Sequence, residues 1–257
     1  MVVGAAEGLG SAFASALAAE GMNLLLVDLQ EEPLEALARQ LAASFGIRVK
    51  TLHLDLAFPK SVEEMMKPIR KADCRLIIYN AAFSRVQKFR QQDPSMLDRY
   101  VQVNMRTPLQ LIHTYCDYHA SAKDLPKGIL LMSSLAGSWG TQLLGPYGGT
   151  KAFSHILAES LYYELKGEGF DVLACLAGAT ATPGYLASEP HGEAKPGRAM
   201  RPDKVVRAAL RALGKRPFVV AGLRNKGIYF LMTRILPRRT SLRIMNRAVG
   251  NRYRNKL

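Results

Sequence analysis

Cysteine is scarce in this sequence, with three residues in a chain of 257. Cys74, Cys116 and Cys175 are widely spaced and form no Cys-x-x-Cys pair, which argues against a disulfide framework and a thiolate metal site. The five histidines also lack the spacing of metal ligands, so we expect no bound metal. These absences favour a reducing, cytoplasmic compartment.

Targeting signals and long apolar runs are missing as well. The N-terminus has no basic segment followed by an apolar run and a small-residue cleavage site, so we expect no signal peptide. The most apolar late stretch, from Ile228 to Leu236, is interrupted by Arg234 and is much shorter than the roughly 20 residues that span a bilayer. The sequence therefore predicts no transmembrane helix, and any membrane association would be peripheral.

Acidic residues are absent from one region of the chain. Residues 204–257 contain 15 Lys and Arg and no Asp or Glu, whereas residues 1–203 contain 20 Lys and Arg against 21 Asp and Glu. Such a cationic tail usually addresses an anionic partner, either a membrane surface or nucleic acid, although a solvated helix face has the same composition. No base-reading motif accompanies the tail, so nucleic acid is not the expected partner.

The tail also carries apolar residues at helical spacing, and Pro237 divides them between two short helices. Basic amphipathic helices of this kind lie in a membrane interface, or they cover the body of the protein or a partner subunit. We therefore divide the chain into a catalytic domain, residues 1–222, and a basic amphipathic extension, residues 223–257. The apolar positions are Ile228, Leu231, Met232, Ile235, Leu236, Leu242, Met245 and Val249.

Strand-like and helix-like segments alternate through the body, which predicts one α/β domain: a Rossmann-type, doubly wound parallel sheet with helices on both faces. A short apolar strand is followed by Gly4, Gly8 and Gly10, and then by an Ala-rich helix over residues 11–20. Such a turn lets the backbone approach a pyrophosphate, which the helix N-terminus attracts through free amides and its dipole. Taken alone, the spacing fits an ordinary tight turn equally well.

An acidic residue ends the second predicted strand, which covers residues 23–27. Asp28 lies eighteen positions beyond Gly10, where a carboxylate can hold a ribose diol and would repel a 2′-phosphate. No Arg or Lys follows before Arg39, so NAD is the favoured cofactor and NADP the alternative. In isolation, Asp28 also fits the role of a helix N-terminal charge before Glu31 and Glu32.

Polar residues follow the next two predicted strands as well, at Asp55 and Asn80. Because the carboxyl ends of parallel strands meet at one edge of a sheet, we expect all four strand ends to share a crevice. The competing interpretation is that each residue is a helix cap or a turn former, since Asp and Asn are frequent in both.

The most specific pattern lies later in the chain. An apolar strand over residues 128–132 ends in Ser133 and Ser134, and a helix then opens with Tyr147 and Lys151. The spacing of four makes these two side chains neighbours on a helix, where an ammonium favours the phenolate of a phenol with a reference pKa of about 10. A Tyr/Lys pair at this spacing also arises by chance on amphipathic helices.

Taken in order, these motifs resemble those of the short-chain dehydrogenases/reductases in their compact, single-domain form. The resemblance extends to residue 220, and Ser134 precedes Tyr147 by thirteen positions, as the family pattern requires. The first strand is short for this family, so we expect that a few N-terminal residues are missing. The matching residues are Gly4, Gly8, Gly10, Asp55, Asn80, Ala81, Ala82, Asn104, Ser134, Tyr147, Lys151, Ala177, Gly178 and Thr182.

The resemblance implies an NAD(P)-dependent oxidoreductase that interconverts a secondary alcohol and a ketone by hydride transfer. Tyr147 would exchange a proton with the substrate oxygen, and Lys151 would lower the pKa of Tyr147 and hold the nicotinamide ribose. Ser134 would hydrogen-bond the substrate oxygen, with Ser133 as the alternative. Asn104 would position a water that links Lys151 to solvent.

The resemblance also implies a homo-oligomer, either a dimer or a tetramer, and a substrate-covering loop from Pro183 to Pro202. An apolar or lipid-like substrate is expected if the tail docks at a membrane. The alternative function is a catalytically weak, cofactor-sensing binding protein on the same fold, against which the intact catalytic residues argue. The expected cofactor contacts are Gly4, Gly8, Leu9, Gly10, Asp28, Asp55, Leu56, Asn80, Ala81, Tyr147, Lys151, Gly178 and Thr182.

Overall fold

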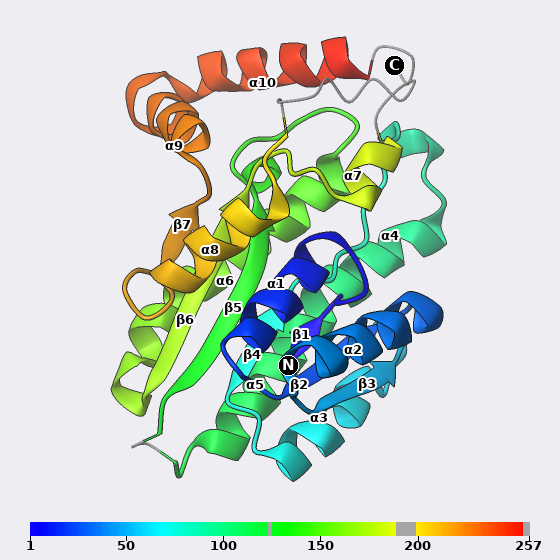
Figure 1. Cartoon of the computed structure of the whole chain (residues 1–257). Coiled ribbons are helices and arrows are strands. Elements are labelled where there is room, and N and C mark those ends of the chain that lie inside the picture. The colour runs from blue at the N-terminus through cyan, green and yellow to red at the C-terminus, as the bar shows by residue number, and fades with distance from the viewer. Residues whose placement is uncertain (123–124, 189–198, 254–257) are drawn as a thin grey trace.

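A seven-stranded parallel sheet forms the centre of the computed structural model, which describes residues 1–122, 125–188 and 199–253. The strand order is β3-β2-β1-β4-β5-β6-β7, and helices cover both faces (Figure 1). The predicted doubly wound α/β fold is therefore confirmed. The strands are β1 (Val2–Val3), β2 (Leu24–Asp28), β3 (Val49–His53), β4 (Leu76–Tyr79), β5 (Lys127–Ser134), β6 (Phe170–Ala177) and β7 (Phe218–Val220).

Two helix layers enclose the sheet, with α1, α2 and α8 in one apolar core and α3, α5 and α6 in the other. A π-helical turn at residues 102–106 joins α4 to α5, and another at residues 231–235 follows α9. The helices are α1 (Gly8–Ala19), α2 (Glu31–Phe45), α3 (Ser61–Ala72), α4 (Pro94–Val101), α5 (Thr107–His119), α6 (Gly145–Glu164), α7 (Pro183–Ser188), α8 (Pro202–Ala212), α9 (Leu223–Phe230) and α10 (Arg238–Arg252).

Alternate strand residues face the two layers. Leu26 and Leu130 belong to the core under α1, α2 and α8, whereas Val27 and Leu131 belong to the opposite core. Both faces are covered, so the inner strands β1, β4 and β6 consist mainly of apolar residues, whereas the edge strand β3 also carries polar side chains. Polar side chains are therefore concentrated beyond the carboxyl ends of the strands, which is where open α/β sheets bind their ligands.

The C-terminal segment lies across one end of the molecule. Helix α10 runs above α7, and α9 lies at the beginning of this segment (Figure 1). Pro237 separates the two helices, as the sequence predicted, because α10 begins directly after it. Within the described residues, no helix combines the length and the apolar character needed to cross a membrane.

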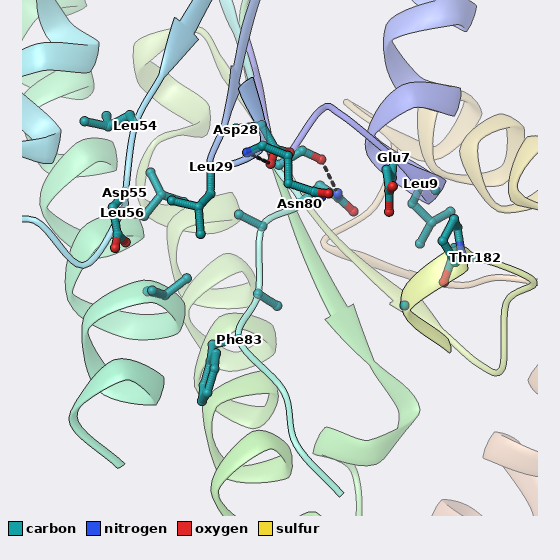
Figure 2. A pocket seen from close by; sticks show the side chains of 18 of the residues that line it. Glu7, Leu9, Asp28, Leu29, Leu54, Asp55, Leu56, Asn80, Phe83 and Thr182 are labelled. Carbon is teal, nitrogen blue, oxygen red and sulfur yellow. Dashed lines mark hydrogen bonds between the residues drawn. The ribbon is translucent and has the colours of Figure 1, made fainter. Parts of the chain in front are cut away.

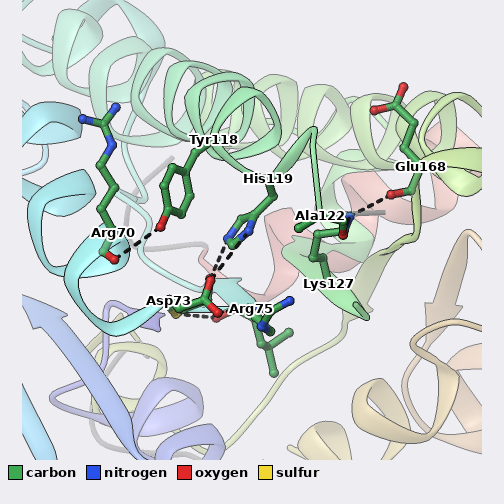
Figure 3. Close-up of polar contacts among 10 residues, drawn as sticks. Arg70, Asp73, Arg75, Tyr118, His119, Ala122, Lys127 and Glu168 are labelled. Carbon is green, nitrogen blue, oxygen red and sulfur yellow. Dashed lines mark hydrogen bonds and ion pairs between the residues drawn. The ribbon is translucent and has the colours of Figure 1, made fainter. Parts of the chain in front are cut away.

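The opposite end of the sheet is closed by polar side chains that bind backbone carbonyls (Figure 3). Lys127, at the start of β5, is 2% exposed, and its Nζ donates to the carbonyl oxygens of Ala122 and Glu168 at 2.7 and 2.8 Å. His119 Nε2 lies 3.1 Å from the carbonyl oxygen of Cys74. These contacts satisfy the ends of α5 and of neighbouring turns, so this cluster has a structural role.

Candidate active site

The glycine turn after β1 brings backbone segments too close together for larger residues. Gly4 has a φ of +78°, and a Cβ on it would lie 2.6 Å from the backbone of Ala81. A Cβ on Gly10 would lie 1.8 Å from the carbonyl oxygen of Gly4. Asn80 Nδ2 donates to that same carbonyl at 2.7 Å and fixes the turn to the end of β4.

Helix α1 begins inside this turn, at Gly8, three residues earlier than the sequence predicted. Its N-cap residue, Glu7, makes no side-chain capping bond, so the first amides of α1 are not occupied by a cap. A glycine cradle beside an uncapped helix N-terminus fits the pyrophosphate of a dinucleotide. Gly10 itself does not line the crevice, because it is buried beneath Gly4.

The four predicted strand ends do share one crevice, of about 530 Å³ (Figure 2). Gly4, Asp28, Asp55 and Asn80 all line it, which confirms the expected clustering. Predicted contacts Gly8, Leu9, Leu56, Ala81 and Thr182 lie along the same walls.

Asp28 is held rigidly at the edge of this crevice. Its Oδ2 accepts a hydrogen bond from the Ala6 amide at 2.9 Å, and its Oδ1 accepts one from the Gln30 amide at 3.0 Å. Helix α2 begins only at Glu31, so Asp28 bonds the residue before the helix and the glycine turn together. A carboxylate has further lone pairs, so both oxygens can still accept from a ribose diol.

Three charged groups complete the crevice, and the sequence identified only one of them. Glu7 lines it beside Asp28, whereas Asp55 is paired with Arg99, whose NH2 lies 2.9 Å from Asp55 Oδ2. Among the described residues that line the crevice, Arg99 is the only cation, and Asp55 neutralises it. No cation at this site is therefore available for an additional phosphate.

A second cavity, of about 820 Å³, adjoins the first and contains Ser134, Tyr147 and Lys151. Ser134 is the last residue of β5, and Tyr147 and Lys151 lie in the first turns of α6. The same cavity is lined by Gly178 after β6. The two cavities share a wall, so one extended ligand can reach from Asp28 to Tyr147. The shared residues are Leu9, Asn80, Ala82, Thr182 and Gly184.

The pKa shifts of Tyr147 and Lys151 differ from the prediction. Burial raises the pKa of Tyr147, and a hydrogen bond with Ser134 only partly opposes this. Lys151 does not lower it as expected, because its Nζ lies 5.8 Å from the centre of the Tyr147 ring and donates to the carbonyl oxygen of Met132 at 2.7 Å. Burial also lowers the pKa of Lys151 itself, to about 8.

Of two other predicted residues, Asn104 is not among the residues that line the cavity, whereas Ser133 lines it but uses its hydroxyl elsewhere. Both Asn104 Nδ2 hydrogens are used, by the carbonyl of Phe83 at 2.9 Å and the hydroxyl of Thr150 at 3.0 Å, and its Oδ1 accepts from the Phe83 amide. Its side chain therefore has no hydrogen left to donate to a water, and only the second lone pair of Oδ1 can accept one from it. Ser133 donates its hydroxyl to the carbonyl of Lys151, which makes Ser134 the better candidate of the two serines.

The sequence did not place the C-terminal tail in the active site. Met245, Val249, Arg252 and Tyr253 line the catalytic cavity, together with Asn225 of α9. The periodicity of the tail was visible, but it did not distinguish a membrane from the body of the protein. Of the predicted loop from Pro183 to Pro202, four residues before residue 189 line the cavity, and residues 189–198 lie outside the described residues.

Residues 1–190 match the short chain dehydrogenase family. The chain belongs to this family. A 7beta-hydroxysteroid dehydrogenase from Collinsella aerofaciens is 32% identical over 229 residues, which is 88% of this chain and 86% of that protein. The short-chain dehydrogenase studied here therefore acts on CH–OH groups with NAD(P).

Solved structures agree with this assignment. A 7beta-hydroxysteroid dehydrogenase structure has a TM-score of 0.86 and 29% identity, and the match covers 95% of both chains. A short-chain dehydrogenase from Sphingobium yanoikuyae, solved in complex with NADPH, has a TM-score of 0.77 and 27% identity and is matched over 85% of its length and 86% of this chain.

The depressed pKa of Lys151 predicts how the stability of this dehydrogenase depends on pH. Between pH 8 and 10.5, the folded protein holds Lys151 neutral while the unfolded chain still protonates it, so the free energy of unfolding rises with pH. Below about pH 8 both states are protonated and the burial penalty is constant. Urea unfolding should therefore show that the difference in free energy of unfolding between wild type and Lys151→Met changes with pH only between pH 8 and 10.5. A constant difference would contradict it.

Proposed function

We propose that this dehydrogenase interconverts a bulky, apolar secondary alcohol of the 7β-hydroxysteroid type and the corresponding ketone, with Tyr147 as general acid and base. The observation that carries the proposal is the convergence of Ser134, Tyr147 and Lys151 in a cavity of about 820 Å³ beside the dinucleotide crevice. Cavities of this size enclose drug-sized ligands. The names of the relatives in Collinsella aerofaciens and among solved structures support the steroid class.

Each side chain has a chemical task in this reaction. The raised pKa of Tyr147 keeps its phenol protonated at neutral pH, so it can donate the proton to a carbonyl oxygen during reduction. Ser134 donates a hydrogen bond to the same oxygen as negative charge develops there. The nicotinamide, when bound, supplies or accepts the hydride.

Lys151 and Asn104 would assist the proton transfer from Tyr147 without contacting the substrate oxygen. A protonated Lys151 beside the ribose would stabilise the phenolate that Tyr147 leaves after proton transfer. Since both Asn104 side-chain hydrogens are engaged, a relay water would have to donate to Asn104, either to its Oδ1 or to its backbone carbonyl. Asn104 would then act by holding the backbone at Phe83 against Thr150 of α6.

A direct assay tests the proposal. Purified protein is incubated with NAD and, in separate reactions, a 7β-hydroxysteroid, its 7α epimer and cyclohexanol, and reduced nicotinamide is followed by absorbance. We expect turnover of the 7β-hydroxysteroid with the highest kcat/KM of the three, because the cavity encloses a large apolar body. Binding of NADH without turnover of any alcohol or ketone would instead favour a cofactor-sensing protein.

The cofactor preferred in this proposal is NAD, with NADP as the weaker ligand. Asp28 presents carboxylate oxygens where a ribose diol would lie, and Glu7 adds a second negative charge to the same crevice. The 2′-phosphate of NADP would meet both charges without a free cation, since Arg99 is paired with Asp55. NADPH in the Sphingobium yanoikuyae structure is a property of that relative.

We predict that NADH binds at least tenfold more tightly than NADPH. Asp28→Ala should weaken NADH binding by about tenfold or more, because a charge-assisted hydrogen bond contributes roughly 1.5–3 kcal/mol. Glu7→Gln should improve NADPH binding and leave NADH binding nearly unchanged. Fluorescence titration in one buffer measures all of these, with Glu20→Gln at the exposed end of α1 as the control. Equal affinities of the wild type for the two cofactors would contradict the preference.

The proposal also places the protein at anionic membrane surfaces. Six large apolar side chains of the tail are exposed, and exposed basic residues such as Arg238 and Arg239 accompany them. The free energies of inserting the apolar side chains and of attracting anionic lipid would then add. The catalytic cavity opens beneath the same tail, so docking would bring it close to lipid-dissolved substrates. The exposed residues are Leu223, Ile228, Phe230, Leu231, Ile235 and Ile244.

We predict that the protein sediments with phosphatidylserine-containing vesicles but not with neutral vesicles, and that added salt releases it. Each basic residue near such a surface contributes about 1 kcal/mol. The double substitution Arg238→Glu and Arg239→Glu should therefore lower binding at least tenfold, while Arg39→Glu with Lys71→Glu serves as the charge-matched control. Equal sedimentation of the two variants would contradict docking through the tail. Charge reversal leaves α10 in place, which truncation would not.

A homo-oligomer, either a dimer or a tetramer, also belongs to the proposal. Helices α4, α5 and α6 expose Val101, Leu109, Ile156 and Tyr163, which are 44–72% exposed. Exposed apolar side chains on these helices favour association with a second copy. Sedimentation velocity of the purified protein would test this, and a concentration-independent monomer would contradict it.

A further inference from the structure

One side chain joins the C-terminal helix to the loop that leads into the catalytic helix. Asn246 of α10 accepts the Gln142 amide on its Oδ1 at 2.8 Å, and its backbone carbonyl accepts Gln142 Nε2 at 3.0 Å. Its Nδ2 donates to the carbonyl of Gly140 at 3.0 Å. The remaining Nδ2 hydrogen bonds the carbonyl of Leu242, within α10. Both polar atoms of the Asn246 side chain therefore have partners. One side-chain bond reaches Gln142 and one reaches Gly140, while the third stays within α10.

The loop that Asn246 holds is strained and adjoins the catalytic residues. Leu143 adopts a φ of +67°, a left-handed conformation that a residue with a branched side chain rarely takes. Such a conformation persists only where its surroundings enforce it. The carbonyl of Leu143 accepts the Gln87 amide at 3.1 Å on one side, and Asn246 binds the preceding residue on the other. Helix α6 begins two residues later and carries Tyr147 in its first turn.

The neighbours of Asn246 on α10 form part of the substrate cavity. Met245 and Val249 line the catalytic cavity, as Thr141 and Leu144 of the held loop do. Ile244, the preceding residue of α10, is 46% exposed and is absent from the lining. The bonds of Asn246 therefore join two walls of one cavity, the loop before α6 and the C-terminal helix.

Trp139, the single tryptophan of the chain, lies beside this junction. It is 4% exposed, directly precedes Gly140, and has its ring 6.0 Å from that of Tyr229 in α9. Its burial therefore depends on the packing of the loop against the C-terminal helices. Quenching of its fluorescence by acrylamide reports that packing without any need for turnover.

We infer that Asn246 is a positioning residue for the substrate cavity: it holds α10 against the loop of residues 140–144, and the closed cavity selects bulky apolar substrates. The inference rests on the proposed function of Tyr147, because the cavity it completes is the one that contains this phenol. In this role the tail is an integral wall of the catalytic domain. Its outward side stays free for the exposed apolar and basic residues already described.

The experiment compares Asn246→Leu with Asn251→Leu, which makes the same change at an exposed position of the same helix. The probes are NAD with a 7β-hydroxysteroid and with cyclohexanol. Asn246→Leu should raise KM for the steroid at least tenfold and KM for cyclohexanol less than threefold, with KM for NAD unchanged. Asn246→Asp keeps the acceptor for the Gln142 amide and loses the donor to Gly140. Its KM for the steroid should therefore lie between the values for Asn246→Leu and wild type.

Two further measurements separate positioning from a general loss of structure. Met245→Ala should raise the steroid KM, while Ile244→Ala, its outward neighbour, should not. Acrylamide should quench Trp139 more strongly in Asn246→Leu than in Asn251→Leu. The inference is overturned if Asn246→Leu matches Asn251→Leu in Trp139 quenching and steroid KM, or if it lowers only the melting temperature.

Failure of the proposed function would look different. Should Tyr147→Phe keep full activity, or should no alcohol be turned over, the assignment of the cavity as catalytic fails. Trp139 quenching and steroid binding by equilibrium dialysis would then still decide whether Asn246 closes this cavity. Loss of steroid binding in Asn246→Leu but not in Asn251→Leu would support the closure, and equal binding would overturn it.

Discussion

Replacing Tyr147 by phenylalanine is expected to lower kcat by about 10²- to 10⁴-fold, the range that a positioned general acid or base contributes. The substitution removes one oxygen and keeps the ring, so the walls shared with Ser134 and Lys151 stay in place. NADH binding should therefore remain within a few-fold of wild type. A fall in kcat without a matching fall in cofactor affinity is the signature of an interaction made in the transition state.

A second tyrosine on the same helix provides the control. Tyr163 of α6 is 72% exposed and lies far along the helix from the cavity, so Tyr163→Phe should leave kcat unchanged. Steady-state kinetics with the best alcohol substrate and fluorescence titration with NADH are measured on both variants. Activity of Tyr147→Phe within a few-fold of Tyr163→Phe would contradict the role of Tyr147 in proton transfer.

The pKa of Tyr147 adds a dependence on direction. Burial raises the pKa of Tyr147 above that of a free phenol, so in the proposed reaction Tyr147 would be a proton donor at neutral pH, which suits reduction of a ketone. Oxidation of an alcohol needs the phenolate, so its rate should rise with pH. The protonated form of Lys151 would oppose this penalty for the phenolate, and its pKa of about 8 limits that help above this pH.

The fold and the dinucleotide crevice could be predicted because their signals are local. Each strand end is marked by a residue type whose chemistry is visible in isolation, such as Asp28 at the end of β2 or Asn80 after β4. Sheet topology then gathers these ends at one edge, since parallel strands all point the same way. Glu7 was not predicted, because it lies between glycines whose spacing indicates a backbone contact with the pyrophosphate and says nothing about side chains.

The long-range contacts could not be predicted in the same way. The apolar spacing of Met245 and Val249 is the same whether α10 packs on a cavity or on lipid, because both environments exclude water. Likewise, the spacing of Tyr147 and Lys151 makes them neighbours but does not fix where the ammonium points. The structure directs it to the carbonyl of Met132, and burial then determines both pKa values.

These contacts connect cofactor, substrate and tail at one end of the sheet. Thr182 lines both cavities and accepts the Tyr185 amide at 3.3 Å, at the start of α7. Tyr185 in turn lies beneath the guanidinium of Arg252, 4.9 Å from its ring centre. A chain of neighbouring residues therefore leads from the cofactor crevice through α7 to α10.

The cofactor crevice itself depends most strongly on Gly10. Gly10→Ala is expected to weaken NADH binding about 100-fold, because its Cβ would lie 1.8 Å from the carbonyl oxygen of Gly4. That oxygen belongs to the backbone and is held by Asn80, so the turn must open and carry the first amides of α1 away from the pyrophosphate. Overpacking of this kind typically costs about 1–3 kcal/mol, and the upper end corresponds to that loss of affinity.

Titration with NADH, together with circular dichroism to establish that the fold is retained, measures this effect. Gly227→Ala in α9 is the matched control, since a Cβ there meets nothing within 4 Å and alanine favours a helix. Gly8→Ala provides a milder step, because its Cβ would lie 2.9 Å from Cβ and Cγ2 of Thr182, a less severe overlap than the 1.8 Å at Gly10, although its φ of +61° also disfavours alanine. NADH affinity should therefore fall in the order Gly227→Ala, Gly8→Ala, Gly10→Ala. If folded Gly10→Ala binds NADH as tightly as Gly227→Ala does, the turn does not hold the pyrophosphate.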